Sequence, residues 1–415
     1  MTADLAQLDT DWDAVVVGAG PAGALAARGL ALSGVRVLLV DKVAFPRWKV
    51  CGCCLNGNAM RTLANIGLAT LTDRLGACPL QDITLATGRR KATLSLPAGV
   101  AVSREAIDAA LIDEATSAGA RFMPGVTAAW QGDTPAQVTL QLTKTRATSN
   151  TPQTDVARPN TIHAVTTRQV TAQLVIAADG LAAGFTRHLP GVRMHLCRHS
   201  RIGAGVTLAK ETSNTNDYPT GRIHMAIAAG GYVGVVRLED HRLNVAAAID
   251  VGLVRSTGGV GPAAEALLRS TCLPPIDSLR DAHWKGTPPL TRRHSAPADA
   301  RVFVIGDAAG YVEPFTGEGM AWAMADAAAL TQCLTQNLVP RGSSTDADQI
   351  QIGLKEAQRR WCAWRRGPTR RRRWRCRLLT SALRYPVATS AGLWILQRWP
   401  TLARPCVRLF NGAPA

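Results

Sequence analysis

The sequence predicts an α/β protein with a Rossmann-like nucleotide-binding domain built from discontinuous segments, a β-rich second domain and a helical, basic C-terminal region. Three observations lead to this prediction. A glycine-rich turn at residues 18–23 follows a β-branched run and opens an alanine-rich segment, which is the order of a strand, a phosphate-binding turn and a helix. Two further glycine stations, Asp179-Gly180 and Gly306-Asp307, each follow an apolar run. Glycine-containing motifs so far apart in the sequence indicate that separate segments of the chain contact one long ligand.

The N-terminal segment contains a complete strand–helix–strand unit. Asp13 to Val17 is a short β-branched run, as expected of a buried parallel strand. Pro21 stands at the first position of an alanine-rich helix that runs to about Ser33, and Gly34 ends it. Residues 35–40 form a second buried strand.

Each glycine of the first turn has a physical role. Gly18 permits the tight turn, Gly20 lets a pyrophosphate approach the backbone, and Gly23 lets helix and strand pack closely. The free N–H groups of the helix start favour phosphate, and Asp41, at the end of the second strand, can accept the two ribose hydroxyls. This unit alone suits either NAD or FAD. Its predicted cofactor-binding residues are Gly18, Gly20, Pro21, Ala22, Gly23, Asp41 and Lys42.

The remaining elements follow in order along the chain. A helix is predicted over residues 104–118, an exposed hairpin or loop over 134–160, and a strand over 173–177. A β-rich, alternating pattern predicts an antiparallel sheet from residues 202–208, 221–228, 232–238 and 243–250. A buried strand over 301–305 and an apolar helix over 319–334 follow, and the last 80 residues are predicted to be helical.

The three stations, taken together, resemble the FAD-dependent superfamily that includes aromatic hydroxylases, flavin-dependent halogenases and geranylgeranyl reductases. The resemblance implies FAD as cofactor, and NADPH or NADH as electron donor. Gly306 and Asp307 match a second FAD contact in which the aspartate binds the ribityl chain, whereas Asp179 and Gly180 match a segment that passes both FAD and the nicotinamide nucleotide. Arg104 matches an arginine that reaches the FAD phosphates.

Finer matches favour the geranylgeranyl reductase branch. Residues 45–52, Phe-Pro-Arg-Trp-Lys-Val-Cys-Gly, resemble the P-x-x-K-x-C-G loop that lies beside the flavin ring in that branch. Gly310, in place of a histidine after Asp-Ala-Ala, and the string Gly317-Glu318-Gly319 point the same way. A helix beginning near Gly317 would direct its positive end at a negatively charged reduced flavin, which predicts cofactor contacts at Gly317 and Gly319.

Three side chains are candidate catalytic groups, and two of them have alternatives. Cys51 is either a thiol acting beside the flavin or a small packing residue, and Glu318 is either a site carboxylate or a residue favoured at a helix start. Tyr232 is the one aromatic in the segment that corresponds to an aromatic-rich strand of the prenyl reductases, which weakens the assignment to prenyl reduction. The W-x-W-x-I-P string of halogenases is absent. His224 is expected to be a surface or satisfied core residue.

The function predicted from these residues is an FAD-dependent oxidoreductase that uses NAD(P)H-reduced flavin on a hydrophobic small molecule. The preferred outcome is reduction of a carbon–carbon double bond, as in a geranylgeranyl reductase-like enzyme. The alternative is a monooxygenase that hydroxylates a polyketide-like or quinone-like aromatic. A third alternative is an FAD-binding protein that acts mainly through its basic C-terminal region.

Composition and charge bound these alternatives. The 415-residue chain has no secretion signal, no apolar run of membrane-spanning length, and ten cysteines without a disulfide framework, so we expect a cytoplasmic protein without a metal centre. The net charge is +17, and residues 359–377 contain ten arginines, no acid, and Trp361, Trp364 and Trp374. Such a segment is a solvated helix face, a peripheral surface for an anionic membrane or, least favoured, a site for nucleic acid.

The predicted domain boundaries follow from the stations. The family resemblance covers about residues 12–335. We expect the FAD-binding domain at residues 1–75, 101–185 and 295–335, the substrate domain at 76–100 and 186–294, and the basic helical region at 336–415.

Overall fold

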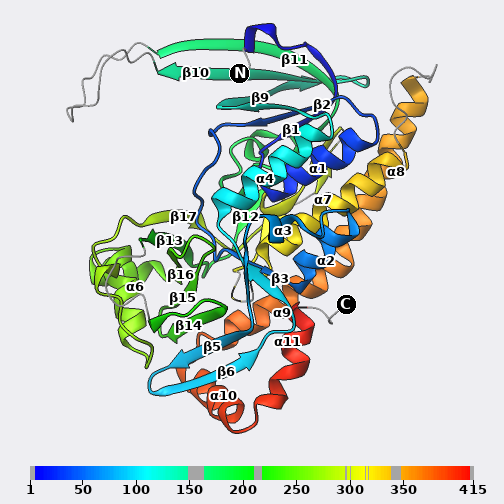
Figure 1. Cartoon of the computed structure of the whole chain (residues 1–415). Helices are drawn as coiled ribbons and strands as arrows, with labels where there is room; N and C mark the ends of the chain where they lie inside the picture. Colours follow the sequence, from blue (N-terminus) through cyan, green and yellow to red (C-terminus); the bar gives the residue numbers. More distant parts are fainter. Residues whose placement is uncertain are drawn as a thin grey trace.

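The computed structural model describes residues 5–147, 163–209, 217–294, 297–299, 301–313, 315, 317–337 and 347–411. The predicted α/β class is confirmed, because two large sheets and several helix layers make up the molecule, and the C-terminal region is helical (Figure 1). None of the helices within these ranges combines the length and the apolar character that crossing a membrane requires.

The first domain is built on an eight-stranded sheet. Its parallel core places β1 between β2 and β11, so the ends of the three strands meet at one edge. Ligands bind at the carboxyl ends of parallel strands, and the first and second glycine stations both lie at this edge. The core strands in order are β20 (Val302–Val304), β11 (His163–Ala177), β1 (Asp11–Val17), β2 (Val37–Asp41) and β8 (Arg121–Pro124).

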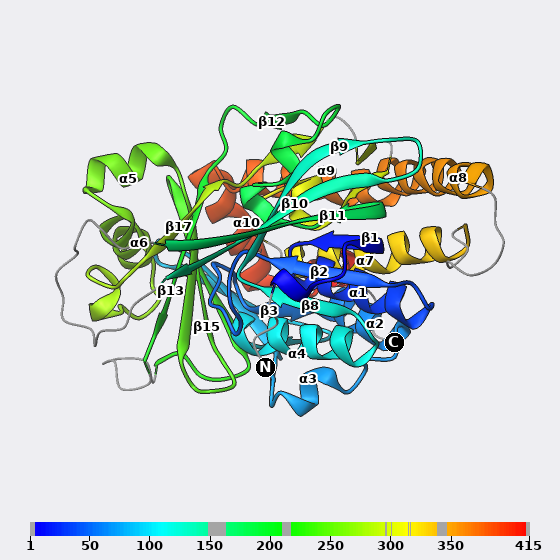
Figure 2. The same ribbon diagram turned by 90° about the horizontal axis from the view of Figure 1, so that it is seen from above.

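One face of this sheet is covered by three helices that the sequence predicted. They are α1 (Pro21–Leu32), α4 (Arg104–Ser117) and α7 (Gly319–Thr335), and they enclose the largest apolar core of the protein with the sheet. Figures 1 and 2 show these helices side by side along the sheet. Two short helices, α2 (Gly57–Asn65) and α3 (Leu71–Arg74), extend this layer.

The region over residues 134–160, predicted to be an exposed hairpin or loop, forms a strand with hairpin pairing in its described part, but it is not exposed throughout. Val138–Ala147 forms β10, which pairs along its length with β11 and also with β9 (Val126–Asp133). Val138, Leu140 and Leu142 are fully buried, but the polar residues between them dominated the composition and hid the alternation. The second half, residues 148–160, lies outside the described residues.

The second large sheet is built from the segments in which we expect the substrate domain. Its seven strands pair mainly antiparallel, as predicted, although β14 and β5 pair in parallel. Helices α5 (Val251–Thr257) and α6 (Val260–Arg269) lie on its outer face. The strands in spatial order are β17 (Lys285–Pro289), β13 (Ile202–Leu208), β16 (Leu243–Ile249), β15 (Gly231–Arg237), β14 (Arg222–Ala228), β5 (Asp82–Thr87) and β6 (Arg90–Ser95).

Two three-stranded sheets connect the domains. The first contains β3 (Cys54–Asn56), β7 (Gly99–Ala101) and β4 (Cys78–Pro79). The second contains β12 (Met194–Leu196), β18 (Arg292–His294) and β21 (Gly310–Tyr311), while β19 (Ala298–Asp299) extends the large sheet at β20.

The C-terminal helices pack across both domains rather than forming a free tail. They are α8 (Ala347–Arg366), α9 (Pro368–Ala382), α10 (Pro386–Arg398) and α11 (Arg404–Asn411). Helix α8 lies along α7, and α10 lies against β5 and β6 (Figure 1). Trp361 is fully buried and stacks on Trp364 at 5.4 Å between ring centroids. These two tryptophans therefore belong to the core and not to a solvated helix face.

Candidate functional site

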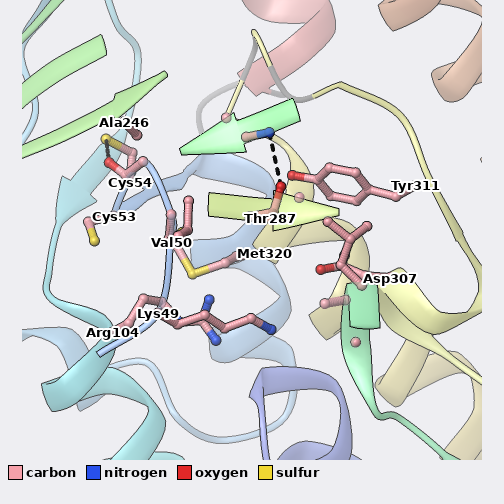
Figure 3. A pocket seen from close by; sticks show the side chains of 18 of the residues that line it. Lys49, Val50, Cys53, Cys54, Arg104, Ala246, Thr287, Asp307, Tyr311 and Met320 are labelled. Carbon is pink, nitrogen blue, oxygen red and sulfur yellow. Dashed lines mark hydrogen bonds between the residues drawn. The ribbon is translucent and has the colours of Figure 1, made fainter. Parts of the chain in front are cut away.

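A cavity of about 870 Å³ lies between the two domains. At one end it borders the glycine turn after β1 and the loop that precedes β3. At the other end it borders the inner face of the seven-stranded sheet and residues of α9, α10 and α11. Figure 3 shows its central part, where side chains from both domains meet.

The glycine turn is shaped to bring backbone N–H groups to the cavity. A Cβ atom at Gly18 would lie 2.4 Å from the Ala178 carbonyl oxygen, and one at Gly23 would lie 1.8 Å from the Gly18 oxygen, so neither position admits a side chain. Around Gly20 the space is open: the nearest atoms to a Cβ there are guanidinium nitrogens of Arg47 at 3.6 Å and of Arg104 at 3.9 Å. The helix start thus faces two cations, which is an arrangement for a pyrophosphate.

Both arginines are held in position by carboxylates. Arg104 donates to the two oxygens of Asp108 at 2.9 and 2.7 Å from within the same helix. A nitrogen of Arg47 lies 3.7 Å from Asp108 and 3.8 Å from Asp41. Asp41 also accepts the N–H groups of Ala19 at 2.8 Å and of Val43 at 3.0 Å. Asp41 therefore shapes the turn as well as bordering the cavity, and Lys42 lies beside it on the cavity rim.

The Gly306-Asp307 station brings a carboxyl group to the cavity, and Lys49 of the 45–52 loop brings an ammonium group to it. Gly306 has a φ of +62° and its N–H donates to Asp326 at 3.0 Å, which directs Asp307 into the cavity (Figure 3). Burial raises the pKa of Asp307, opposed by Lys49 and Arg104, and burial also lowers the pKa of Lys49. Lys49 makes no hydrogen bond or ion pair with the residues that the structure describes.

The Asp179-Gly180 station has a structural role as well. The Asp179 carboxylate accepts the N–H groups of Phe185 at 2.7 Å and Thr186 at 3.2 Å, and it also bonds the Thr186 hydroxyl. The Asp179 carboxylate oxygens are thus used in hydrogen bonds to the turn that follows, although the residue borders the cavity. Gly180 has a φ of +69°, and a Cβ there would lie 3.1 Å from the Lys49 ammonium nitrogen.

The predicted helix start at Gly317-Glu318-Gly319 faces the cavity, but the Glu318 carboxylate does not. Gly317, Gly319 and Met320 line the cavity at the start of α7. Glu318 is absent from the lining, and its carboxylate accepts a hydrogen bond from the Cys376 thiol of α9 at 2.8 Å. Our expectation of a catalytic Glu318 is therefore corrected: the side chain turns toward the C-terminal helices and not into the cavity.

Cys51 lies in the cavity on the loop between β2 and β3. A hydrogen bond from Cys53 and the charge of Arg104 lower the pKa of Cys51 to about 6, against the effect of burial. The same hydrogen bond raises the pKa of Cys53 well above its usual value. The Asn244 amide donates to the Cys51 carbonyl at 3.0 Å, which ties the loop to β16. The thiolate is the reactive form of cysteine, and Cys51 also packs against the apolar core, so a chemical role and a packing role both stay open.

Two tyrosines supply hydroxyl groups to an otherwise apolar wall. Tyr232 is 5% exposed, its hydroxyl has no hydrogen-bond partner among the described residues, and its ring meets Phe315 edge-on at 5.1 Å. Tyr311 lies across the cavity beside Asp307 (Figure 3). Burial raises the pKa of both tyrosines well above the usual value. Both hydroxyls therefore stay protonated at neutral pH and can donate to a ligand.

The floor of the substrate side is made of small side chains. In the register of the sheet, Gly205 of β13, Ala246 of β16 and Gly234 of β15 lie in one row. The next row contains Gly203 and Ala248 before it reaches Tyr232. Gly203, Gly234, Ala246 and Ala248 line the cavity, so the middle of the sheet leaves room for a bulky apolar molecule.

Comparison with protein families bears directly on this geometry. A family model described as "FAD binding domain" matches residues 11–351. The chain belongs to this FAD-binding family. It is a flavin-dependent oxidoreductase, as its sequence relatives and its fold both indicate.

Two curated relatives cover most of the chain. A menaquinone reductase of Mycobacterium tuberculosis is 27% identical over 373 residues, which span 85% of this chain and 84% of that protein. Digeranylgeranylglycerophospholipid reductase 2 of Methanosphaera stadtmanae is 26% identical over 362 residues, 83% of this chain and 81% of that protein. Among solved structures, a flavoprotein/dehydrogenase from Cytophaga hutchinsonii superposes with a TM-score of 0.72 over 96% of this chain and 92% of that chain. At 16% identity, this last likeness concerns the fold.

The residues at the cavity fit FAD. Gly20 with Arg47 and Arg104 suits the pyrophosphate, and Asp307 offers an acceptor for a ribityl hydroxyl. Lys49 offers a half-buried cation that makes no ion pair with an acidic residue among the described residues. Its position in the 45–52 string was visible in the sequence, as was that of Arg47, but neither was singled out. Tyr311 was also missed, although it follows Gly310 directly.

Proposed function

We propose that this FAD-dependent protein reduces a carbon–carbon double bond in a hydrophobic, isoprenoid-like molecule, with NADPH or NADH as the electron donor. The floor of glycine and alanine in an apolar cavity is the observation that supports this proposal. The two curated relatives are named as reductases of a menaquinone and of a digeranylgeranyl lipid, and both names describe bulky apolar substrates.

The shape of the cavity suits such a molecule. Leu80, Leu94 and Leu96 form its wall on the side of β5 and β6. Gly234 and Ala246 line the floor, and a Cβ at Gly234 would lie 2.9 Å from the Met225 sulfur, so a larger residue at 234 would have to displace Met225. An apolar chain bound in it would leave water at about 25 cal/mol for each Å² of surface buried.

Saturation of a double bond needs a hydride, which bound FAD would supply once NADPH or NADH has reduced it, and a proton. Tyr311 is placed to hold that proton. It lies on the cavity beside Asp307, and its hydroxyl is 3.3 Å from the position of a Cβ at Gly319. Its raised pKa keeps the hydroxyl protonated until a strongly basic atom forms next to it. Tyr232 is the second hydroxyl that can orient a polar head group.

The test is an anaerobic turnover assay with FAD-loaded protein, NADPH or NADH, and a short-chain menaquinone in detergent. We expect a product heavier by two hydrogen atoms by mass spectrometry. Tyr311→Phe should lower kcat by about 100-fold, the lower end of a proton donor's usual contribution. The exposed Tyr385 provides the matched control Tyr385→Phe.

The hydroxylase alternative makes the opposite forecast in air. Oxygen consumption in step with substrate, together with a product heavier by one oxygen atom, would replace the reductase by a monooxygenase. Unchanged product formation when oxygen is removed supports the reductase.

A further inference from the structure

We propose that α10, the turn of Pro400–Ala403 and α11 dock on an anionic lipid bilayer, and that the substrate enters the cavity from that bilayer. The proposal rests on the proposed function only in requiring a hydrophobic substrate. We call the surface the docking face and define it by Val387, Ala391, Trp394, Ile395, Arg398, Trp399, Leu402, Arg404 and Arg408.

Exposed apolar side chains gather in this part of the chain. Eight of the fifteen large hydrophobic side chains that are exposed among the described residues lie between 374 and 402. They are Trp374 at 61%, Leu378 at 51%, Tyr385 at 67%, Val387 at 84%, Trp394 at 52%, Ile395 at 40%, Trp399 at 49% and Leu402 at 58%. Such a concentration marks an interaction surface, whereas single exposed apolar residues are ordinary.

Helix α10 orders these residues into a stripe. Val387, Ala391, Trp394 and Ile395 are exposed and recur at the spacing of one helix face. The opposite face carries Thr389 and Leu393, which are 8% and 3% exposed and lie on the side of β5 and β6. The rings of Trp394 and Trp399 meet edge-on at 6.1 Å, so the stripe continues past the end of the helix. The structure thus buries one side of α10 and leaves the other side apolar.

The cavity reaches the turn of Pro400–Ala403 that follows this stripe. Leu396, Leu402, Ala403 and Val407 all line the cavity. Leu402 is 58% exposed at the same time, so its side chain stands at the mouth. An apolar molecule that leaves the cavity here meets exposed tryptophan and aliphatic side chains before it meets open water.

The charge around the stripe favours a bilayer over a second copy of the chain. No acidic residue follows Glu356 in the sequence, and Arg398, Arg404 and Arg408 are exposed on the docking face. Two such faces in contact would bring arginines together without a carboxylate to pair them. Tryptophan rings and arginines instead suit the headgroup level of an anionic membrane, where each cation contributes about 1 kcal/mol.

The first experiment measures flotation of the full-length, FAD-loaded protein with vesicles of phosphatidylcholine, with and without phosphatidylglycerol. We expect flotation with the anionic vesicles that weakens as salt rises. The variant Arg398→Gln/Arg404→Gln/Arg408→Gln should lower the partition coefficient by about 100-fold, which is about 1 kcal/mol for each arginine at about 1.4 kcal/mol per factor of ten. Exposed arginines elsewhere give the matched control Arg121→Gln/Arg255→Gln/Arg359→Gln, which should float like the parent.

The apolar part of the docking face is tested in the same way. Val387→Ser/Trp394→Ser/Trp399→Ser should abolish flotation, whereas Leu32→Ser/Leu196→Ser, which removes exposed leucines elsewhere, should not. Equal loss in the docking-face and control variants, or no flotation of the parent, would overturn the proposal. A docking-face variant that changes the mass of the lipid-free protein by light scattering would overturn it in favour of a second copy of the chain.

Turnover separates this proposal from the proposed function. Docking-face variants should retain reduction of a short-chain quinone in detergent and lose reduction of a long-chain quinone embedded in vesicles. Protein that floats but reduces neither substrate leaves membrane docking intact and rejects the reductase. Protein that reduces the short-chain quinone but does not float rejects the docking face and keeps the reductase.

Discussion

Lys49 and Cys51 show how burial and a few neighbours set the chemistry of single residues in this cavity. Lys49 is an ammonium group withdrawn from water without an acidic partner among the described residues, so its pKa is lowered by burial. Cys51 lies two residues on, and its pKa is lowered to about 6 by a hydrogen bond from Cys53, with Arg104 adding to the effect. Each is poised to respond to charge that a ligand brings.

Lys49→Met should weaken FAD binding. A charge-assisted hydrogen bond is worth about 1.5–3 kcal/mol, so we expect a rise in the FAD dissociation constant of about 10- to 100-fold, measured by quenching of flavin fluorescence. Lys355→Met is the matched control, because Lys355 is exposed on α8 and does not line the cavity. Equal effects of the two variants would contradict a special role for the buried ammonium.

Cys51 should react with iodoacetamide at unusually low pH. The sign follows from the direction of the shift: a lowered pKa means that the thiolate is already present above about pH 6, where an ordinary thiol at about 8.5 is protonated. Mass spectrometry of each cysteine-containing peptide across a pH series gives the midpoint. Cys78 is the internal comparison, since burial raises its pKa. A Cys51 midpoint above that of Cys78 would contradict the geometry.

The role of a residue could be predicted where its reason lies within a few residues in the sequence. It could not be predicted where the residue contacts a segment that is distant in the sequence. In the glycine turn of residues 18–23, a Cβ at Gly23 would meet the Gly18 oxygen of the same turn, so the need for glycine at 23 arises locally and could be predicted. Glu318 could not be assigned from its string, since Cys376 lies 58 residues on and approaches only after α9 has packed. Tyr232 was found through the resemblance of its segment to the aromatic-rich strand of the prenyl reductases, whereas Tyr311 became apparent only from the fold.

At the scale of elements, α8 and α9 supply the arginines that hold the loop of the Gly306-Asp307 station. Arg365 pairs with Asp326 and donates to the Ala309 carbonyl at 2.7 Å. Arg373 donates to the Gly310 carbonyl at 2.8 Å, and burial lowers its pKa to about 9. Arginines that the sequence analysis grouped with a surface segment therefore hold the loop that carries Asp307.

Arg365→Met should destabilise the protein by about 3 kcal/mol, because it leaves Asp326 as a buried charge without its partner. Thermal and urea unfolding of the FAD-loaded protein measure the effect. Arg359→Met is the matched control on the same helix: Arg359 is 80% exposed and pairs with Glu356 at 3.8 Å, and such pairs contribute about 0–1 kcal/mol.

The double variant Arg365→Met/Asp326→Asn tests the cause. If the loss comes from the uncompensated carboxylate, the second substitution should restore part of the stability. A double variant as unstable as the sum of the two single variants would contradict this explanation.

The strands of the substrate sheet make a different forecast. Ala246→Phe should fill the floor between Gly205 and Gly234 and lower kcat/KM for a long-chain substrate by at least about 10-fold, since overpacking costs about 1–3 kcal/mol. FAD binding should stay intact, as measured by the flavin absorbance. Ala228→Phe, at the end of β14, is the control. Equal turnover of long-chain and short-chain substrates by Ala246→Phe would contradict the role of the floor.

At the scale of the whole molecule, the main sheets and helices could be predicted, but the contacts between segments distant in the sequence could not. The period-2 and helical patterns of β1, α1 and β13–β16 arise from burial within one element and its neighbours, and these elements appear as expected. The parallel pairing of β5 with β14 joins segments far apart in the sequence. The packing of α10 along β5 and β6 is another contact between distant segments. No pattern in the sequence of these segments predicts this packing or the pairing of β5 with β14.

The stability of the whole protein should fall in mild acid, partly through His224. We expected a satisfied core or surface residue there, but it is 6% exposed and neither ring nitrogen has a partner among the described residues. Burial lowers its pKa to about 4, against about 6.5 in an unfolded chain. The unfolded chain binds the extra proton in this window, so the contribution of His224 is present above about pH 6.5 and is lost as pH falls toward 4.

His224→Met should flatten the fall of unfolding free energy between about pH 6.5 and 4 by up to the contribution of one bound proton. Urea unfolding at several pH values measures the slope for parent and variant. The exposed His283 supplies the control His283→Met. An unchanged slope in His224→Met would mean that the ring gains a partner in solution.

The contacts from Arg365 and Arg373 to the Ala309 and Gly310 carbonyls also impose an order on biosynthesis. Translation proceeds from the N-terminus, and domains begin to fold as they emerge. The loop around Asp307 emerges before α8 and α9 and lacks its final contacts until those helices have been synthesised. Stable capture of FAD should therefore be a late, post-translational event, and nascent chains arrested before α8 should bind FAD less tightly than the finished protein does.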